Sequence, residues 1–249
     1  APYYNAGRGA VYNADGKNEL EASSMDGKTL NAGAGAGVHN VRTPVLLARK
    51  VMTESVHVML IGEGAEAFAR EQGIAFEDDA WFHTDYRWEQ LQKARAKAKE
   101  TADSAGAPDT WLSTVGAVAL DKDGNLAAAT STGGMTNKRW GRVGDVPVIG
   151  AGTYADNESC AVSATGHGEY FIRATVARDI CARVQYTGAS LQQAADEVVM
   201  QKLVEMGGSG GIISLDPQGH VSLTFNTPGM YRASIDRDGR VYVGIYNDE

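Results

Sequence analysis

The stretch Thr114-Val115-Gly116-Ala117-Val118-Ala119-Leu120 begins with a hydroxyl-bearing side chain and continues with small or β-branched apolar residues. Asp121-Lys122-Asp123-Gly124, which follows directly, has the composition of a tight turn. Residues 125–131 form a second run of the same small, apolar character. Two such runs on either side of a short polar turn predict a β-hairpin.

The rest of the second half alternates between strand-like and helix-like patterns. The predicted elements are a strand at 160–165, amphipathic helices at 169–186 and 190–206, a hairpin at 211–225 that turns at Pro217-Gln218-Gly219, and a last strand pair around Asp238-Gly239. Strands followed by two helices and then by more strands predict helices layered on sheet, with antiparallel hairpins dominating this half.

The first half carries fewer strand signals. Thr43-Pro44 places a capping residue before a proline at the first helical position, which predicts that a helix begins there. The other predicted elements are a short buried strand at 57–61, a helix at 63–72 stopped by Gly73, and a helix from 87 to about 105. Residues 31–37 alternate glycine with small residues but lack the neighbouring features of a dinucleotide site, so tight packing or turns is the better interpretation.

Bulk composition excludes several classes of function. The net charge of -8 and the pI near 5.2 argue against a surface for nucleic acid or anionic membrane. No apolar run approaches the ~20 residues of a membrane-spanning helix, so a soluble protein is expected. We expect the cytoplasm, with the periplasm left open because a removed signal peptide leaves no trace. Cys160 and Cys181 lie in apolar stretches without CxxC spacing, and the expectation is two buried free thiols.

Common catalytic signatures are missing from the sequence. The five histidines are scattered, and none has the i, i+4 spacing of a helical metal pair, so a metallohydrolase is not supported. There is no Walker phosphate loop. What remains is an abundance of threonine, serine and glycine in the second half.

Several motifs follow one another in order along the chain. In the second half they are residues 114–121, 129–138, 141–145, 150–155, 165–169, 207–211, 225–227 and 229–232. These motifs resemble the plant-type asparaginase, or isoaspartyl peptidase, family of N-terminal-nucleophile hydrolases. Upstream, residues 5–9, 25–27 and 61–66 are similar to the family's α-subunit. The resemblance therefore spans nearly the whole chain.

The resemblance implies a fold, which is the α+β, four-layer αββα sandwich of N-terminal-nucleophile hydrolases. Residues 1–113 would form the α-subunit portion of a precursor and residues 114–249 the β-subunit that begins with the nucleophile, together making one folded domain. The family's first strand, ending in His-Gly-Gly-Ala-Gly, and its following helix do not occur here. The chain is therefore expected to lack both elements and to start inside the α-subunit, which could expose a sheet edge.

A threonine at a new N-terminus carries its own base. Its hydroxyl is a weak nucleophile unless a base takes the proton, and a free α-amine, with an ordinary pKa of about 7.7–8.0, can do so. This chemistry requires the bond between Ser113 and Thr114 to break first, by attack of the same hydroxyl on the preceding carbonyl. Ser113 stands where relatives commonly have glycine or aspartate, and its more crowded side chain is expected to slow the cleavage.

Carried across by motif, the resemblance assigns the catalytic residues. Thr114 would be nucleophile and base, and Thr132 would hydrogen-bond its hydroxyl. The Thr165 hydroxyl and the Gly166 N–H would form the oxyanion hole. Each of these residues alone has a plainer reading, such as a β-forming threonine or a turn, and only their joint order favours catalysis.

The resemblance also assigns the substrate-binding residues. Arg142 would hold the substrate's α-carboxylate through its planar guanidinium, and Asp145 would pair with the α-ammonium. Gly168 would line the pocket, and Asn5 would face it from the other subunit. Such a site selects a side-chain amide, because only that bond has both free charges beside it.

The same family pattern sets expectations for cofactors and partners. No cofactor is expected for catalysis, but a structural sodium ion would be held by backbone carbonyls near Tyr4, Ala6 and Arg8. The substrate would be an amino acid or a dipeptide, with neither nucleic acid nor membrane as a partner. A dimer of cleaved α/β pairs is expected.

Three functions stay open at this point. The first is hydrolysis of β-aspartyl dipeptides and asparagine by an N-terminal-threonine amidohydrolase. The second is a glycosylasparaginase of the same fold, which is less favoured because relatives of that type usually have Asn where this chain has Gly133-Gly134. The third is an unprocessed, non-catalytic fragment or binding protein.

Overall fold

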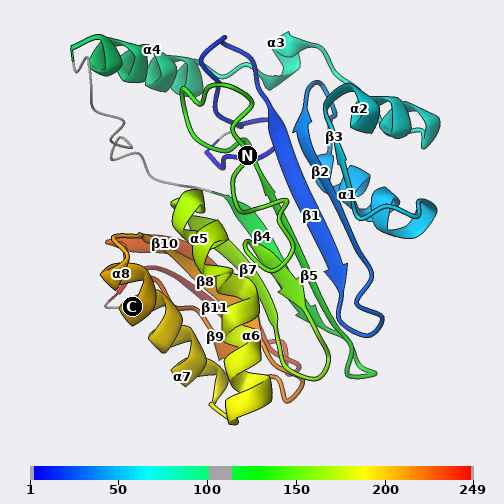
Figure 1. Cartoon of the computed structure of the whole chain (residues 1–249), viewed down its shortest axis with the longest axis vertical. Helices are drawn as coiled ribbons and strands as arrows, with labels where there is room; N and C mark the ends of the chain where they lie inside the picture. The colour runs from blue at the N-terminus through cyan, green and yellow to red at the C-terminus, as the bar shows by residue number, and fades with distance from the viewer. Residues whose placement is uncertain (1–2, 101–113, 248–249) are drawn as a thin grey trace.

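The computed structural model describes residues 3–100 and 114–247, and a five-stranded sheet combines strands from both halves of the chain (Figure 1). Its strand order is β3-β2-β1-β5-β4, and all neighbours are antiparallel except β2 and β3. The strands are β1 (Leu20–Asp26), β2 (Ala32–Val38), β3 (Met59–Ile61), β4 (Val115–Leu120) and β5 (Leu126–Thr132). The hairpin predicted at 114–131 is thus confirmed as β4 and β5, which β1 joins to the first half of the chain.

A second, four-stranded antiparallel sheet has the order β6-β7-β8-β9. Its strands are β6 (Thr153–Ala155), β7 (Ala161–Gly166), β8 (Gly210–Leu215) and β9 (Val221–Ser222). The last two strands, β10 (Gly229–Ile235) and β11 (Val241–Tyr246), form an antiparallel ribbon. The strand at 160–165 and both late hairpins agree with the sequence prediction.

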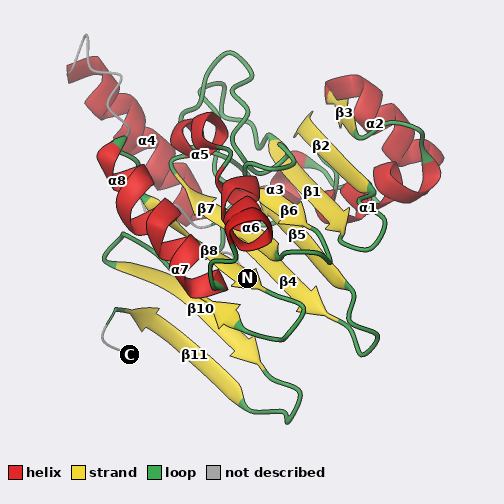
Figure 2. Cartoon of the chain, turned by 60° about the horizontal axis from the view of Figure 1, so that its bottom comes forward, coloured by secondary structure: helices red, strands yellow, loops and turns green. Residues whose placement is uncertain are grey.

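The two sheets pack against each other, with helices on their outer faces (Figure 2). In the first half the helices are α1 (Pro44–Glu54), α2 (Gly62–Glu71), α3 (Asp79–Phe82) and α4 (Asp85–Glu100), of which α3 and α4 lie beyond the ends of the strands (Figure 1). In the second half they are α5 (Gly168–Ala174), α6 (Val176–Thr187), α7 (Leu191–Asp196), the π-helical η1 (Glu197–Lys202) and α8 (Leu203–Glu205). The α+β prediction is confirmed. In the described part of the chain, no helix is both long and apolar enough to cross a membrane.

Close packing explains the glycine-rich stretch at 31–37. It forms β2, and a Cβ at Gly33 would lie 2.1 Å from the carbonyl oxygen of Ala48 in α1. The preference for tight packing was correct, although no strand was predicted here. The prediction of a buried strand at 57–61 was wrong in burial, because β3 is an edge strand whose Ile61 is 67% exposed.

Two helices depart from their predicted extent. The helix predicted at 169–186 is divided into α5 and α6 at Thr175, which adopts the left-handed conformation with φ of 49°. The helix predicted at 190–206 begins as expected, because Ser190 Oγ accepts a hydrogen bond from the backbone N–H of Gln193 at 3.2 Å. It then widens into the π-helical segment η1. Apolar periodicity indicates the helices but not these interruptions.

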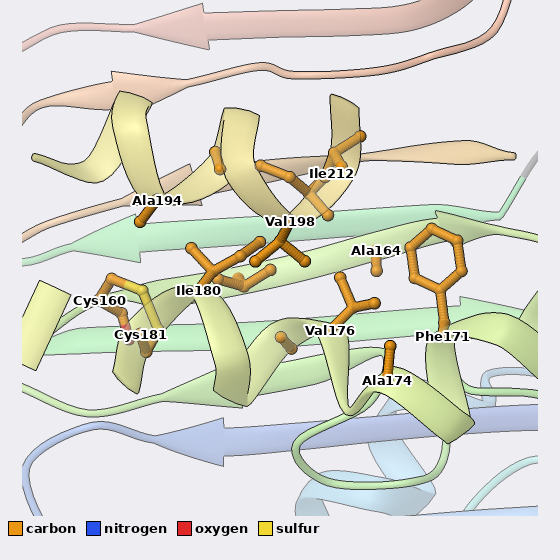
Figure 3. Close-up of a cluster of buried hydrophobic side chains, with 14 of the residues drawn as sticks. Cys160, Ala164, Phe171, Ala174, Val176, Ile180, Cys181, Ala194, Val198 and Ile212 are labelled. Carbon is orange, nitrogen blue, oxygen red and sulfur yellow. Dashed lines mark hydrogen bonds between the residues drawn. A yellow bond between two sulfur atoms is a disulfide. The ribbon is translucent and has the colours of Figure 1, made fainter. Parts of the chain in front are cut away.

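The main apolar core of the second half lies between the second sheet and the helices α5–α8 (Figure 3). Phe171, Ile180 and Ile212 are completely buried there. Burying side chains of this size contributes about 1.5–3 kcal/mol each. This core fixes β7, whose last residues are Thr165 and Gly166, against the rest of the molecule.

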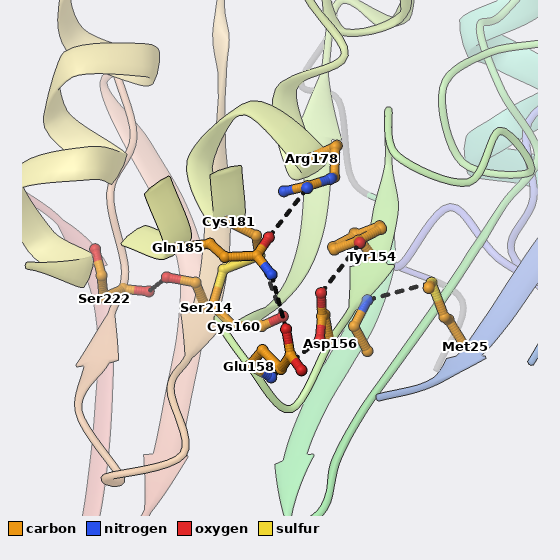
Figure 4. Close-up of a disulfide and its surroundings, with 11 residues drawn as sticks. Met25, Tyr154, Asp156, Glu158, Cys160, Arg178, Cys181, Gln185, Ser214 and Ser222 are labelled. Carbon is orange, nitrogen blue, oxygen red and sulfur yellow. Dashed lines mark hydrogen bonds between the residues drawn. A yellow bond between two sulfur atoms is a disulfide. The ribbon is translucent and has the colours of Figure 1, made fainter. Parts of the chain in front are cut away.

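Cys160 and Cys181 form a disulfide, so the prediction of two free thiols was wrong (Figure 4). Cys160 directly precedes β7, and Cys181 lies on α6, the helix that packs on that strand. This packing brings their Cα atoms to 5.2 Å, within the range that a disulfide spans. A spacing of 21 residues carries no such signal, because the pairing depends on the helix folding back onto its strand.

Removing the disulfide should destabilise the protein. We expect the Cys160→Ala/Cys181→Ala variant to lose about 3 kcal/mol in the free energy of unfolding, the value for a cross-link that closes a loop of this length. Urea denaturation measures it. Reductant should lower the stability of the wild type and leave the double variant unchanged, since the chain has no other cysteine. A wild type that is equally stable with and without reductant would contradict the cross-link.

Candidate active site

Thr114 lies immediately before β4, and its hydroxyl faces the neighbouring strand β5. Thr114 Oγ1 donates a hydrogen bond to Thr132 Oγ1 at 3.2 Å. Thr132 is the last residue of β5, and its hydroxyl also accepts the backbone N–H of Gly134 at 3.0 Å. The two threonines that the sequence links are therefore in direct contact. Ser113, the other residue of the predicted cleavage site, lies outside the described residues.

Asn5 holds the turn that follows Thr132. Its Nδ2 donates to Thr132 Oγ1 at 3.4 Å and to the carbonyl oxygen of Gly134 at 2.7 Å. Its Oδ1 accepts the N–H groups of Val11 and Gly133 at 2.9 and 3.2 Å. All four hydrogen-bonding positions of this buried amide are thus used inside the protein. In this arrangement Asn5 supports the Thr132 turn, and its substrate contact stays a prediction.

Thr165 and Gly166 end β7 with an unusual polar feature. Thr165 Oγ1 is buried and, among the described residues, has no hydrogen-bond partner. A Cβ at Gly166 would lie 2.4 Å from the Phe171 ring and 2.6 Å from the carbonyl oxygen of Ser209, so only glycine fits. A buried hydroxyl without a partner costs free energy unless a ligand satisfies it. The end of β7 is therefore equipped to donate to a bound oxygen.

Arg142 is held by Glu169, a partner that the sequence did not reveal. Its Nε and Nη2 donate to Glu169 Oε1 and Oε2 at 2.8 and 3.1 Å, and His167 Nε2 lies 3.4 Å from the same carboxylate. Burial opposes the charged guanidinium, but the bonds to Glu169 outweigh it and raise the pKa of Arg142. One edge of the guanidinium is thus occupied by Glu169, and no side-chain hydrogen bond from residues 3–100 or 114–247 engages the edge formed by Nη1 and Nη2.

Asp145 is a buried carboxylate with an unsatisfied oxygen. It is 5% exposed, and its Oδ2 has no hydrogen-bond partner within the described residues. Burial raises the pKa of Asp145 to about 7; its own backbone N–H and Arg142 oppose the shift, and Glu21 and Glu169 add to it. A carboxylate in this state gains a large stabilisation from a cation bound beside it.

Gly168 separates Arg142 from Asp145. A Cβ at this position would lie 2.7 Å from Arg142 Nη2 and 2.9 Å from Asp145 Oδ1. Any larger side chain would therefore fill the space between the two charged groups. The glycine that the sequence placed in the pocket wall is required for that space to exist.

The nucleophile and the charged groups meet at Gly134. Its N–H binds Thr132 Oγ1, and a Cβ on it would lie 3.4 Å from Arg142 Nη1. Across the interface between the sheets, a Cβ at Gly116 would overlap the Ser163 hydroxyl, and Thr114 and Thr165 each lie two residues from that contact. Close contacts thus connect the region around Thr114 to Arg142 on one side and to Thr165 on the other.

The segment around Asn5 is held by Arg87, another residue that the sequence did not reveal. Arg87 Nε and Nη2 donate to the carbonyl oxygens of Gly9 and Tyr3 at 2.7 and 2.9 Å. Tyr4 O accepts the N–H of Ala6 at 3.0 Å. Among the described residues, no hydrogen bond ends on the carbonyl oxygens of Ala6 or Arg8. These oxygens suit a hard cation such as sodium.

Comparison with known proteins gives a consistent result over the whole chain. Residues 1–245 match the family model described as Asparaginase. The chain is 56% identical to the isoaspartyl peptidase of Salmonella typhimurium, covering 99% of this chain and 80% of that protein. The isoaspartyl peptidase of Escherichia coli is 55% identical, over 100% of this chain and 78% of that protein. A Xenopus laevis protein named isoaspartyl peptidase/L-asparaginase is 41% identical, over 99% and 78%.

The fold and these matches define an N-terminal-nucleophile amidohydrolase. The chain belongs to the Asparaginase family, and the resemblance read from its motifs is confirmed.

Proposed function

We propose that this chain cleaves itself before Thr114 and then hydrolyses β-aspartyl dipeptides and L-asparagine. Two buried polar atoms, Thr165 Oγ1 and Asp145 Oδ2, carry the proposal because neither has a hydrogen-bond partner in the described part of the chain. The first would donate to an oxyanion, and the second would pair with an α-ammonium. The names of the relatives, isoaspartyl peptidase and L-asparaginase, agree with this pair of requirements.

Self-cleavage would create the catalytic base. In the uncut chain the nitrogen of Thr114 belongs to a peptide bond and cannot accept a proton. Attack of Thr114 Oγ1 on the carbonyl of Ser113 moves the acyl group from nitrogen to oxygen, and water then hydrolyses the ester. The products are a carboxylate at residue 113 and a free amine on Thr114, which divides the chain into residues 1–113 and 114–249.

Hydrolysis then follows in two balanced steps. The Thr114 amine takes the hydroxyl proton as Oγ1 attacks the side-chain carbonyl of the substrate, and Thr165 Oγ1 and the Gly166 N–H stabilise the oxyanion. The proton passes to the leaving nitrogen, which departs as ammonia or as the amine of the next residue. Water attacks the β-aspartyl ester in the same way, releasing aspartate and restoring the threonine hydroxyl. Thr132 orients the nucleophile through its 3.2 Å hydrogen bond.

Selectivity would come from the two charged groups on either side of Gly168. The free Nη1–Nη2 edge of Arg142 suits the α-carboxylate, and Asp145 suits the α-ammonium. An ordinary peptide bond lacks one or both of these free charges. A β-aspartyl bond and the asparagine side chain keep both, so they fit the same site.

Gly133 argues against the glycosylasparaginase alternative. A Cβ at this position would lie 2.7 Å from Asn5 Oδ1 and 2.8 Å from Ala10 Cβ. The asparagine usual in relatives of that type would need this turn to be rebuilt. The packing of the turn therefore favours the dipeptidase and asparaginase activity.

Intact-mass analysis combined with an activity assay tests the proposal. Purified protein is expected to give two masses, matching residues 1–113 and 114–249, and to hydrolyse a β-aspartyl dipeptide and asparagine faster than a glycosylated asparagine. A single uncut mass without turnover would overturn the proposal and leave an unprocessed binding protein. Size-exclusion chromatography with light scattering tests the proposed assembly, a dimer of cleaved pairs.

A sodium ion held by the carbonyls of Tyr4, Ala6 and Arg8 is proposed for the segment that carries Asn5. Such an ion would fix Asn5 and, through it, the Thr132 turn. We expect a higher melting temperature in sodium chloride than in choline chloride at equal ionic strength, because a bound ion stabilises only the folded state. Equal melting temperatures in the two salts would contradict the site.

The disulfide bears on the proposed compartment. Disulfides persist in oxidising compartments and are rare in the cytosol. The Cys160–Cys181 bond therefore supports the periplasmic alternative over the cytoplasmic one. Acid quenching of intact cells, followed by alkylation under denaturing conditions, decides between them, since both cysteines are buried in the folded protein and the cytoplasmic alternative requires both thiols to react once it is unfolded.

A further inference from the structure

Glu21 is a buried carboxylate that the catalytic scheme does not use. It is the second residue of β1 and has no solvent exposure. Its Oε1 accepts from Lys138 Nζ at 3.1 Å, and this lysine is itself 6% exposed. Lys138 Nζ also donates to the carbonyl oxygen of Glu19 at 2.9 Å and lies 3.8 Å from Glu19 Oε2. The ion pair is therefore enclosed and well bonded.

The second oxygen of Glu21 reaches the substrate-binding segment. Glu21 Oε2 accepts the backbone N–H of Gly144 at 3.2 Å. Gly144 lies between Arg142 and Asp145, and a Cβ on it would be 2.8 Å from Arg142 Nη1. The carboxylate thus anchors the backbone between the two residues that would bind the ends of the substrate. In the β1–β5 pairing, Glu21 is also the residue directly opposite Thr132.

The charge of Glu21 acts on both Arg142 and Asp145. It raises the pKa of Arg142, which favours the guanidinium, and it raises the pKa of Asp145, which disfavours the carboxylate. The other charged groups facing Asp145 are Arg142 and Glu169, and His167 faces Glu169. Removing the negative charge of Glu21 would therefore make Asp145 ionise at lower pH.

We propose that Glu21, held by Lys138, is a positioning residue that sets the geometry and charge of the Arg142–Asp145 segment for its amino-acid ligand. The inference rests on the proposed function, which supplies that ligand. A purely structural ion pair would end on side chains or on unrelated backbone. Glu21 instead bonds the N–H group between the two binding residues, from a strand that belongs to the other side of the proposed cleavage site.

Binding of L-aspartate, which carries both α-charges, tests this inference by calorimetry at pH 6 and pH 8. At pH 8 we expect Glu21→Gln to raise the Kd about 10-fold or more, because a charge-assisted hydrogen bond is lost. At pH 6 the Kd of the variant should be closer to that of the wild type, because Asp145 stays ionised to lower pH in the variant. The Thr114 amine titrates in the same range, so the comparison is made between variants at each pH.

Two further variants complete the design. Glu21→Asp keeps the charge but withdraws it from Gly144, so its Kd should rise by the same factor at both pH values. Asp216→Asn is the matched control: Asp216 is 5% exposed and accepts the N–H groups of Gln218 and His220, in the turn after β8. It should bind L-aspartate like the wild type.

The inference would be overturned if the Kd of Glu21→Gln equals that of the wild type, or if it exceeds the wild-type value by the same factor at both pH values. If Glu21→Gln does not fold, Glu21→Asp provides the test. A Kd of Glu21→Asp equal to that of the wild type would then contradict the inference. Hydrolysis of a β-aspartyl dipeptide by the wild type is measured in parallel. If the wild type hydrolyses the dipeptide and the Glu21 variants bind L-aspartate with the wild-type Kd, only this inference is overturned. An uncut and inactive wild type overturns the proposed function.

Discussion

Thr114→Ala is expected to abolish both self-cleavage and hydrolysis. The variant lacks the hydroxyl that would attack Ser113, so the α-amine is never released. Losing nucleophile and base together should reduce kcat by a factor on the order of 10⁴–10⁶, as when a catalytic unit is removed. Intact mass should give one uncut chain, and the assay with a β-aspartyl dipeptide should give background rates.

Thr114→Ser is the matched variant for this experiment. It keeps a hydroxyl in contact with Thr132, so slower cleavage and reduced but measurable turnover are expected. A Thr114→Ala protein that still yields two masses would contradict the assignment of the nucleophile. Because Thr114→Ala stays uncut, it also provides a uniform background for measuring stability.

Asp145→Asn should lower the activity and raise the stability of the protein. Without a negative charge for the α-ammonium, kcat/KM should fall roughly 10²–10³-fold, as when one partner of a buried charge pair is removed. In the Thr114→Ala background, the same substitution should raise the free energy of unfolding at pH 8. The wild-type carboxylate is buried with one unsatisfied oxygen, and asparagine removes its charge.

The pH dependence of this effect follows from the sign of the pKa shift. Burial raises the pKa of Asp145 to about 7 in the folded state, whereas an exposed aspartate ionises near 3.9. Between these values the folded protein binds more protons than the unfolded one, so its stability falls as the pH rises. The full difference corresponds to roughly 4 kcal/mol.

Urea denaturation at pH 4 and pH 8 measures this contribution. The gain from Asp145→Asn should be present at pH 8 and absent at pH 4, where the carboxyl is protonated in the folded state. A gain of equal size at both pH values would contradict the role of the charge. Asp216→Asn is again the control. The wild-type Asp216 carboxylate accepts two backbone N–H groups, so removing its charge should not stabilise the protein.

Sequence patterns predicted the second half of this fold better than the first, for a physical reason. Residues 115–132 form a hairpin, a local structure with a polar turn between apolar runs. β1 was missed because Glu21 and two serines, with Glu19 just before the strand, make the segment look like a polar loop. The two carboxylates are buried beside Lys138, which comes from far along the chain and neutralises them.

The same distinction applies to the site. Thr114 directly precedes β4 and Thr132 ends the adjacent strand β5, and family motifs point to Arg142 and Asp145, so all four could be named from the sequence. Their supporting partners, Glu169 and Glu21, form no motif with them. The Cys160–Cys181 bond was missed for the same reason, since contacts between distant elements appear only once the chain is folded.

The pairing of β1 with β5 has a consequence for the cut protein. Six residue pairs, from Glu21 opposite Thr132 to Asp26 opposite Ala127, join the two sides of the proposed cleavage site within one sheet. The proposed cleavage would therefore leave two polypeptides that share a hydrogen-bonded sheet and unfold together. Refolding then requires two molecules to meet, so the midpoint of unfolding should rise with protein concentration after the cut, but not before it.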